Sequence, residues 1–238
     1  GKFRDSGAII SLYTRAHGKV RLVAKGARRI KGGYGSAVMP LSLTEVSYMM
    51  REGRELHTLR TAESTQVLKT LSGSYDHLMS ALAIAELVEL TQPLHERNEK
   101  LFEALVEALR TLDVSTQNFY STFAAFCLYC AEAMGFAMSL EDTSTQTGDA
   151  MFSLDDGRMV ASTVYVHSRA LRVSQATMHK LKKLSAGGIA LSSEVAMSVD
   201  EQREAHEFFV RYFSYHLDRN IVLRTEKMLL GTPEGKRE

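Results

Sequence analysis

Apolar and polar residues alternate in short runs along the first third of the chain, which is the period of half-buried β-strands. β-branched residues are frequent in these runs, and glycines such as Gly18, Gly26 and Gly53 separate them. We predict strands over residues 8–14, 19–25, 41–50 and 55–63, with a further short piece over 64–68. Several strands of this length and spacing indicate a small β-barrel.

The period of the pattern changes to that of helices after residues 72–74. Apolar residues recur at helical spacing from Tyr75 until Pro93. Further helices are predicted over residues 101–112, 118–134, 174–183 and 199–217. The helix over 118–134 is apolar on all sides, which indicates a central position. We therefore expect an α+β protein with a barrel domain at 1–72 and a mainly α-helical domain at 73–238.

One stretch of the second domain has a weaker pattern. Polar and acidic residues dominate from Ser139 to Thr147, and only weak strand-like pieces occur around residues 150–152 and 159–166. We interpret residues 139–167 as an insertion between the helices. The aromatic stripe of the last predicted helix, by contrast, is typical of core packing.

The composition is that of a globular protein. The 238 residues are 45% hydrophobic, which is enough to bury a substantial core. The sequence shows no run of about 18 apolar residues and no charged-then-apolar leader, so we expect a cytoplasmic protein. Cys127 and Cys130, the only cysteines, lie in the apolar helix and are expected to be buried thiols, not a redox or metal motif.

The net charge of +1 conceals a strong asymmetry along the chain. The first 44 residues hold nine Lys and Arg against the single Asp5, a charge of +8, so the rest of the chain carries −7. No acidic residue occurs between Asp5 and Glu45. This excess of positive charge is typical of a surface that binds phosphate, nucleic acid or an acidic protein. An ordinary solvated face is the less favoured interpretation, because such faces usually mix both signs of charge.

The predicted strand over residues 19–25 separates charged from apolar residues, because side chains alternate between the two faces of a strand. The outward face should carry the cations and the inward face the apolar residues: Lys19, Arg21 and Lys25 against Val20, Leu22 and Ala24. We expect that these cations can be replaced without loss of the fold.

The connection over residues 26–35 holds three cations, Arg28, Arg29 and Lys31, and four glycines. Glycines let the backbone approach phosphates and bend round them, and Tyr34 offers a ring on which a base can stack. The alternative is a flexible hairpin connection whose cations only keep it soluble.

The sequence holds none of the common catalytic motifs. A GxxxxGK[ST] phosphate loop, a GxSxG elbow and an HExxH metal helix are all absent. The eight histidines are scattered, without a second ligand at useful spacing. We expect a binding protein, not an enzyme, with no cofactor and no metal.

Three runs near the front of the chain resemble the RecO family of recombination mediators. They read LYTRAHGK over residues 12–19, VAKGARR over 23–29 and MPL over 39–41. The run FVRYFSYHL over 209–217 resembles the closing helix of the family. The resemblance implies an N-terminal OB-fold β-barrel followed by a helical domain. Family members usually begin with one more strand and an acidic loop, without which the barrel is one strand short.

The resemblance also implies a function in DNA repair and recombination. Family members bind single- and double-stranded DNA, anneal complementary strands, and act with RecR to help RecA replace single-strand-binding protein. A cytoplasmic, nucleoid-associated protein is implied. The acidic tail of single-strand-binding protein would dock on the helical domain, in an apolar pocket flanked by cations. The candidate cations are Arg169, Arg172, Lys180, Lys182, Lys183, Arg211 and Arg219.

Many relatives also carry a four-cysteine zinc site just after the position of Gly135 and Phe136. Residues 139–167 contain no cysteine here, and a tetrahedral structural site needs four soft or imidazole ligands. We therefore expect a degenerate, zinc-free insertion.

The sequence thus predicts a DNA-binding site on the basic front, extended by a lysine-rich helix of the second domain. Its expected residues are Lys19, Arg21, Lys25, Arg28, Arg29, Lys31, Tyr34, Lys180, Lys182 and Lys183. The alternative is a protein-docking adaptor that uses the basic front to bind an acidic partner and binds little DNA.

Overall fold

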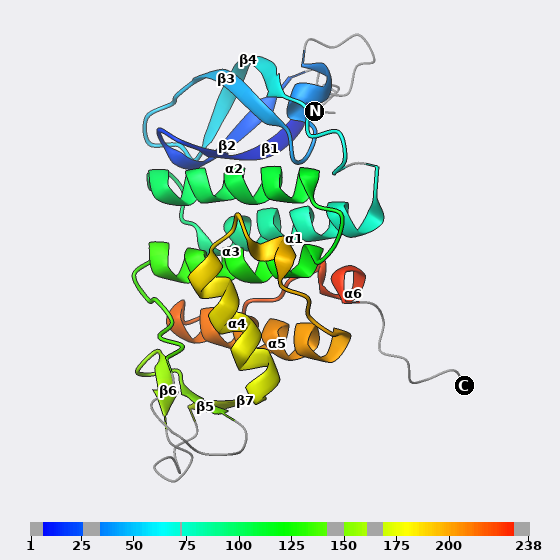
Figure 1. Ribbon diagram of the computed structural model, residues 1–238. Coiled ribbons are helices and arrows are strands. Elements are labelled where there is room, and N and C mark those ends of the chain that lie inside the picture. The colour runs from blue at the N-terminus through cyan, green and yellow to red at the C-terminus, as the bar shows by residue number, and fades with distance from the viewer. Residues whose placement is uncertain (1–6, 26–33, 72, 142–149, 161–168, 231–238) are drawn as a thin grey trace, which may run out of the picture.

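The computed structural model describes residues 7–25, 34–71, 73–141, 150–160 and 169–230 (Figure 1). A sheet lies at one end of the molecule, helices follow in layers, and a smaller sheet lies at the opposite end (Figure 1). This order of strands, then helices, confirms the predicted α+β class. No helix in the described ranges combines the length and apolar character needed to cross a bilayer.

The first sheet has four strands: β1 Ala8–Thr14, β2 Gly18–Ala24, β3 Leu43–Met49 and β4 Leu56–Gln66. Their order is β1-β2-β4-β3, with β2 and β4 parallel and the other pairs antiparallel. The separate strand predicted over residues 64–68 is wrong, because β4 continues without a break to Gln66. Within the described residues β1 and β3 do not pair with each other, so the barrel is open.

The open side of the barrel faces the helices across a cavity of about 780 Å³. Residues of β1, of β3 and of the short 3₁₀ helix η1 (Gly35–Val38) line one side of this cavity, and residues of the first two helices line the other.

A small core fills the inner face of the first sheet. Val20, Leu22 and Ala24 are fully buried and pack with Leu59 and Ala62 of β4. The predicted inward face of β2 is therefore confirmed.

The helical region begins with α1 Tyr75–Thr91, α2 Glu99–Val114 and α3 Phe119–Ala133. The predicted central helix is confirmed, since α3 packs against α1 and α2 and against two later helices, α4 (Gln175–Gly187) and α5 (Val199–His216). Cys127 and Cys130 on α3 are fully buried, as expected. Burial raises the pKa of both thiols, that of Cys130 to about 12.

The β1–β2 hairpin fixes the first sheet to this helical region. Gly18 at the turn has a φ of 60°, and a Cβ there would lie 1.8 Å from the carbonyl oxygen of Glu96. The next residue, Lys19, accepts a hydrogen bond on its carbonyl from the His95 amide at 2.9 Å. Only glycine fits so close to the loop between α1 and α2.

The second sheet comprises β5 Ala150–Ser153, β6 Arg158–Val160 and β7 Ala170–Val173, in the order β6-β5-β7. It packs on α5 Val199–His216, where the Phe152 ring lies 5.0 Å from Phe208 and 5.6 Å from Tyr212. The aromatic stripe of α5 thus serves packing, as predicted. Helix α4, Gln175–Gly187, extends beyond its predicted end, and a short helix α6, Glu226–Leu229, follows α5 without having been predicted.

Candidate nucleic-acid interface

The outer face of the first sheet is the face opposite the small core. It carries alternate residues of the four strands, among them Ile9, Arg21, Val23, Met49, Leu56, Thr58 and Arg60. The last turn of α1 covers one end of this face, where Lys19 and Ser11 bond to Glu89. Of the alternate residues named first, all but Val23 and Thr58 are exposed. The predicted cations of β2 therefore have different environments along the strand.

Lys19 lies at the covered end, and its predicted exposure is wrong. Its side chain is only 8% exposed, and its ammonium donates to the carbonyl of Glu89, in the last turn of α1, at 2.6 Å. Burial lowers the pKa of Lys19, which the nearby Glu89 carboxylate partly offsets. Strand alternation placed Lys19 on the correct face, but α1 packs against that face.

Arg21 lies at the boundary between the covered and open parts of the face. Its guanidinium is 3.5 Å from the carboxylate of Glu89, and both side chains are partly exposed. The Ser11 hydroxyl of β1 donates to the same carboxylate at 2.5 Å. Glu89 thus contacts Ser11, Lys19 and Arg21.

Lys25 lies beyond the end of β2 and is exposed, as predicted. It makes no ion pair with any residue that the structure describes. Arg28, Arg29 and Lys31 lie outside the described residues, and their predicted contacts with DNA stay predictions.

Tyr34 packs instead of projecting into solvent. Its ring contacts the small core of the sheet, and its hydroxyl donates to the carbonyl of Leu59 at 3.3 Å. The half-buried ring covers the core next to η1, which does not support the expected role as a free stacking surface.

Lys180, Lys182 and Lys183 lie on α4, which packs on α3 and α5. Figure 1 shows α2 between this helix and the first sheet. The structure therefore does not bring these three lysines together with the cations of β2.

Three further arginines that were not predicted are exposed on the first sheet or next to it. Arg51 and Arg54 lie in the exposed connection between β3 and β4, and Arg60 lies on β4. None of the three has an ion-pair partner in the part of the chain that the structure describes. Arg60 lies in the predicted strand over residues 55–63, where its alternation with the apolar Leu59 is the sequence signal that could have indicated an outward position.

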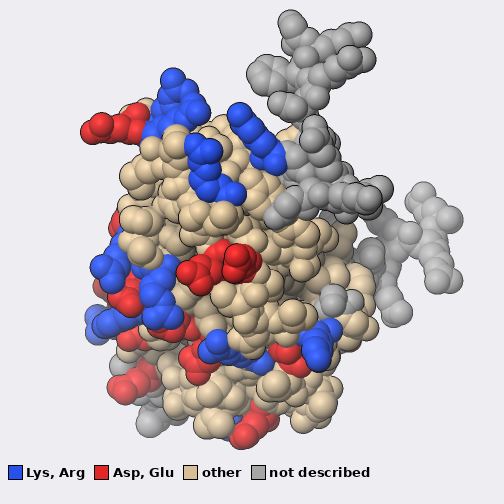
Figure 2. Space-filling view, turned by 90° about the horizontal axis from the view of Figure 1, so that it is seen from above, with Lys and Arg blue, Asp and Glu red and all other residues tan. Residues whose placement is uncertain are grey.

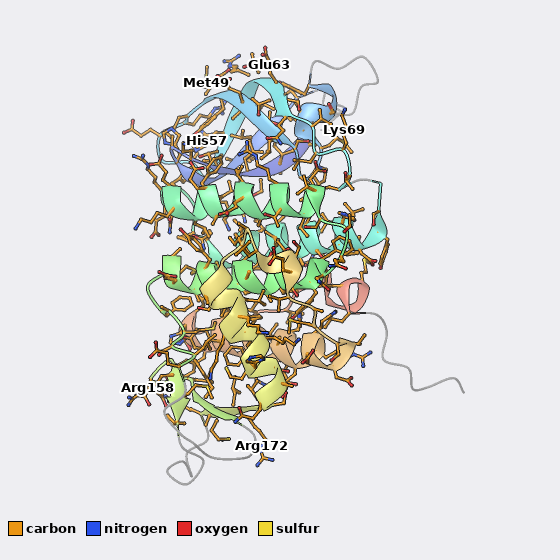
Figure 3. The ribbon with its side chains drawn as sticks, viewed as in Figure 1. Met49, His57, Glu63, Lys69, Arg158 and Arg172 are labelled. Atoms are coloured by element: carbon orange, nitrogen blue, oxygen red, sulfur yellow. The ribbon has the colours of Figure 1, made fainter. Side chains whose placement is uncertain are left out.

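Figure 2 shows this end of the molecule from above, with several separate groups of Lys and Arg side chains and acidic groups between them. The register pairs two exposed carboxylates, Glu45 on β3 and Glu63 on β4, directly opposite each other. Figure 3 labels Glu63 at the same end of the molecule as Met49, which lies four residues from Glu45 along β3. The outer face therefore carries both cations and carboxylates, the latter on β3 and β4.

Side-chain contacts link the predicted insertion to α5. Arg169 donates to the Asp155 carboxylate at 3.2 Å and to the Tyr215 hydroxyl at 3.2 Å, and its guanidinium lies over the Tyr215 ring. Tyr215 in turn donates to Asp155. Among the described residues no group of three or more His, Cys, Asp or Glu side chains is arranged to hold a metal ion.

Two family models match the chain, one after the other. The model described as Recombination protein O N terminal matches residues 1–68, and the model described as Recombination protein O C terminal matches residues 72–224. The first match covers the open barrel, and the second runs from just before α1 to Arg224.

Curated relatives agree with the family models. A DNA repair protein RecO from Pelotomaculum thermopropionicum is 29% identical over 226 residues, covering 92% of this chain and 87% of the relative. Those from Salinibacter ruber and a Nocardioides species are 24% and 28% identical and cover 91% and 92% of this chain, with 84% and 91% of the relatives covered. The chain therefore belongs to the RecO family of DNA repair proteins.

Proposed function

We propose that this protein binds single- and double-stranded DNA and anneals complementary strands as a recombination mediator, acting by binding and without catalytic turnover. In this proposal it acts with RecR to help load RecA onto strands coated by single-strand-binding protein. Family membership supports this assignment.

The observation that carries DNA binding is the set of exposed cations without ion pairs on the first sheet and in its connections. Lys25, Arg51, Arg54 and Arg60 are exposed and have no acidic partner among the described residues. Cations that are not neutralised within the protein are available to replace the counterions of phosphate groups. Lys19 is excluded from this set because its ammonium is already bonded within the protein.

A salt titration with a labelled oligonucleotide of about 16 nucleotides, the upper site size of one OB-fold, tests the proposal. The double variant Lys25→Ala with Arg60→Ala should bind more weakly. Its slope of log affinity against log salt should fall by about 0.7 for each lost contact on single strands. Arg224→Ala, an exposed arginine of the helical region, serves as the matched control.

An unchanged affinity and slope in a folded double variant would remove the outer-face cations from the DNA site. The protein-docking adaptor would then be the better description if the parent also bound oligonucleotides only weakly. An acidic partner protein held by the same cations would lose affinity in the same variant.

Lys180, Lys182 and Lys183 form a second proposed contact region, used only by longer strands, because α2 separates α4 from the sheet (Figure 1). Replacing all three with Ala should leave a short oligonucleotide unaffected and weaken a longer one. An equal loss of affinity for the short and the long oligonucleotide would contradict this placement.

The acidic tail of single-strand-binding protein is proposed to bind the helical region. A tail peptide should therefore bind the Lys25→Ala, Arg60→Ala variant as tightly as the parent, with less salt dependence than DNA, since an apolar anchor releases no counterions. Loss of peptide binding in that variant would move the tail site to the first sheet.

A further inference from the structure

A histidine of β4 projects into the interior of the first sheet. His57 pairs in register with Leu22 of β2, and paired residues project from the same face, which here is the inner one. His57 is only 2% exposed. Its imidazole stacks on the Tyr48 ring of β3, with the ring centres 5.8 Å apart. A side chain that can take up a proton near neutral pH is therefore packed among apolar and aromatic groups.

One hydrogen bond fixes the protonation of the neutral ring. The backbone amide of Arg51, in the connection between β3 and β4, donates to Nδ1 of His57 at 3.2 Å. An amide nitrogen can only donate, so Nδ1 holds no proton and Nε2 carries it. Nε2 is buried and has no hydrogen-bond partner among the described residues. Neither nitrogen of His57 therefore has a lone pair free for a metal ion.

A second histidine reaches His57 from the helical region. His95 lies in the loop between α1 and α2, and its ring centre is 5.0 Å from that of His57. The backbone of this loop is held in place, because the His95 amide donates to the Lys19 carbonyl at 2.9 Å. Burial lowers the pKa of His57, and the nearby His95 lowers it further. The folded protein therefore favours a neutral His57.

The groups that face this pair of histidines do not offset a positive charge. The Tyr48 hydroxyl is buried, and burial raises its pKa, so this ring stays neutral. His17, from the turn between β1 and β2, lies edge-on to Tyr48 with the ring centres 6.1 Å apart. Glu55 and Glu96 flank the pair along the chain and are exposed, and within the described ranges neither bonds to a histidine. The exposed side chain of Arg51 adds positive charge.

We propose that His57 is a pH-sensitive switch: protonation of its ring detaches the connection between β3 and β4, residues 50–55, from the first sheet. A protonated imidazole carries a hydrogen on both nitrogens, so Nδ1–H would point at the Arg51 amide. Two donors cannot bond to each other, and the like charge of a protonated His95 adds to the cost of a charged ring at this place. The ring and the connection therefore separate when the proton is taken up.

The direction of the switch follows from linkage between protonation and folding. The pKa of His57 is lower in the folded protein than in the unfolded chain, where it is about 6.5. The contact with the Arg51 amide is therefore complete above the unfolded pKa and is lost as the pH falls through the folded pKa. The connection also carries Arg54, so both exposed arginines are held less firmly in acid.

Hydrogen exchange of the Arg51 amide, followed by NMR in the full chain from about pH 7.5 to about pH 5, tests the switch. The protection factor, which corrects for the intrinsic effect of pH on exchange, should fall by up to about tenfold for each pH unit below about 6.5. In the same samples, the imidazole signals of His57 at the higher pH should show the proton on Nε2.

Three variants accompany this measurement. His57→Asn keeps an oxygen acceptor for the Arg51 amide but cannot be protonated, so its protection factor should not depend on pH. His95→Gln removes the neighbouring charge that lowers the pKa of His57, so the loss of protection should begin at a higher pH. His179→Gln, at an exposed position of α4, is the control and should behave like the parent.

The inference is overturned if the Arg51 amide of the parent keeps its protection factor throughout this range, or if a folded His57→Asn variant loses protection as the parent does. Imidazole signals that place the proton on Nδ1 would also overturn it, and they require no variant to fold. Simultaneous loss of protection over the whole first sheet would show general unfolding in acid and would contradict a local switch. None of these measurements involves DNA, so failure of the inference leaves the proposed function standing.

Discussion

The ammonium of Lys19 on β2 donates to the carbonyl of Glu89 in the last turn of α1, at 2.6 Å. The last carbonyls of a helix carry partial negative charge and favour a cation. Arg219 donates to the neighbouring carbonyl of Leu90. Two cations from distant parts of the chain therefore cap the same helix end, and one of them joins the first sheet to the helical region.

Replacing Lys19 with Glu should therefore destabilise the protein strongly. The change buries a carboxylate between the Glu89 carbonyl and the Glu89 carboxylate, which leaves an unpaired buried charge and costs about 3 kcal/mol or more. Lys25→Glu, at an exposed position of the same face, should leave the free energy of unfolding nearly unchanged. Urea unfolding of both variants checks the difference, and equal stabilities would contradict the structural role of Lys19.

Replacing Glu89 with Gln should strengthen DNA binding. The neutral side chain releases Arg21 from its partly exposed ion pair, so that Arg21 can contact a phosphate. The free energy of such an exposed pair corresponds to about a two- to fivefold increase in DNA affinity. The salt slope should become steeper by about 0.7, as expected for one added phosphate contact on a single strand. Glu103→Gln, which removes the nearer of the two carboxylates paired with Arg15, is the control. An affinity that stays at the parent's value would show that Arg21 does not reach the DNA.

The second sheet should depend on apolar packing and not on metal. Phe152 is fully buried against α5, so Phe152→Ala should cost about 3–5 kcal/mol. The chelator EDTA should leave the thermal unfolding midpoint of the parent unchanged, because Cys127 and Cys130 alone cannot complete a four-ligand zinc site. About one zinc per chain in the purified protein, lost together with the fold in EDTA, would refute this prediction.

Glu204 on α5 is bonded to the start of α4. Its carboxylate accepts from the Ser174 amide at 2.7 Å, from the Ser174 hydroxyl at 2.5 Å, and from the Thr177 hydroxyl. Burial acts to raise the pKa of Glu204, but these hydrogen bonds outweigh it and lower the pKa below its usual value. The ionised form is therefore stabilised in the folded state.

Glu204→Gln should lower the free energy of unfolding at pH 7 by about 1–3 kcal/mol, the contribution of hydrogen bonds to a charged group. Because the folded pKa is below the unfolded one, this contribution is complete above the unfolded value of about 4.3 and is lost as the pH falls through the folded pKa. The gap between parent and variant should close in acid. Glu207→Gln, exposed on the same helix and paired with Arg211, should show no such dependence, and a gap independent of pH would contradict the assignment.

Much of the fold followed from local pattern. The predicted strand over residues 8–14 coincides with β1, and the inward face of β2 is filled by Val20, Leu22 and Ala24 as expected. Period two and period 3.6 are properties of neighbouring residues, so they can be recognised without knowledge of the rest of the chain. The family resemblance and the excess of cations at the front depend in the same way on sequence alone.

The sequence by itself determined which residues are charged and which face of each strand they occupy, but only the tertiary structure decided which of them reach solvent. Lys19 and Lys25 belong to the same outward face, yet α1 covers the first and leaves the second exposed. Ile9 of β1 and Met49 of β3 likewise lie on the same face, joined through Val23 and Thr58, only because four strands pair in one register. Both outcomes arise from contacts between residues far apart in the chain, whose pairing no local period specifies.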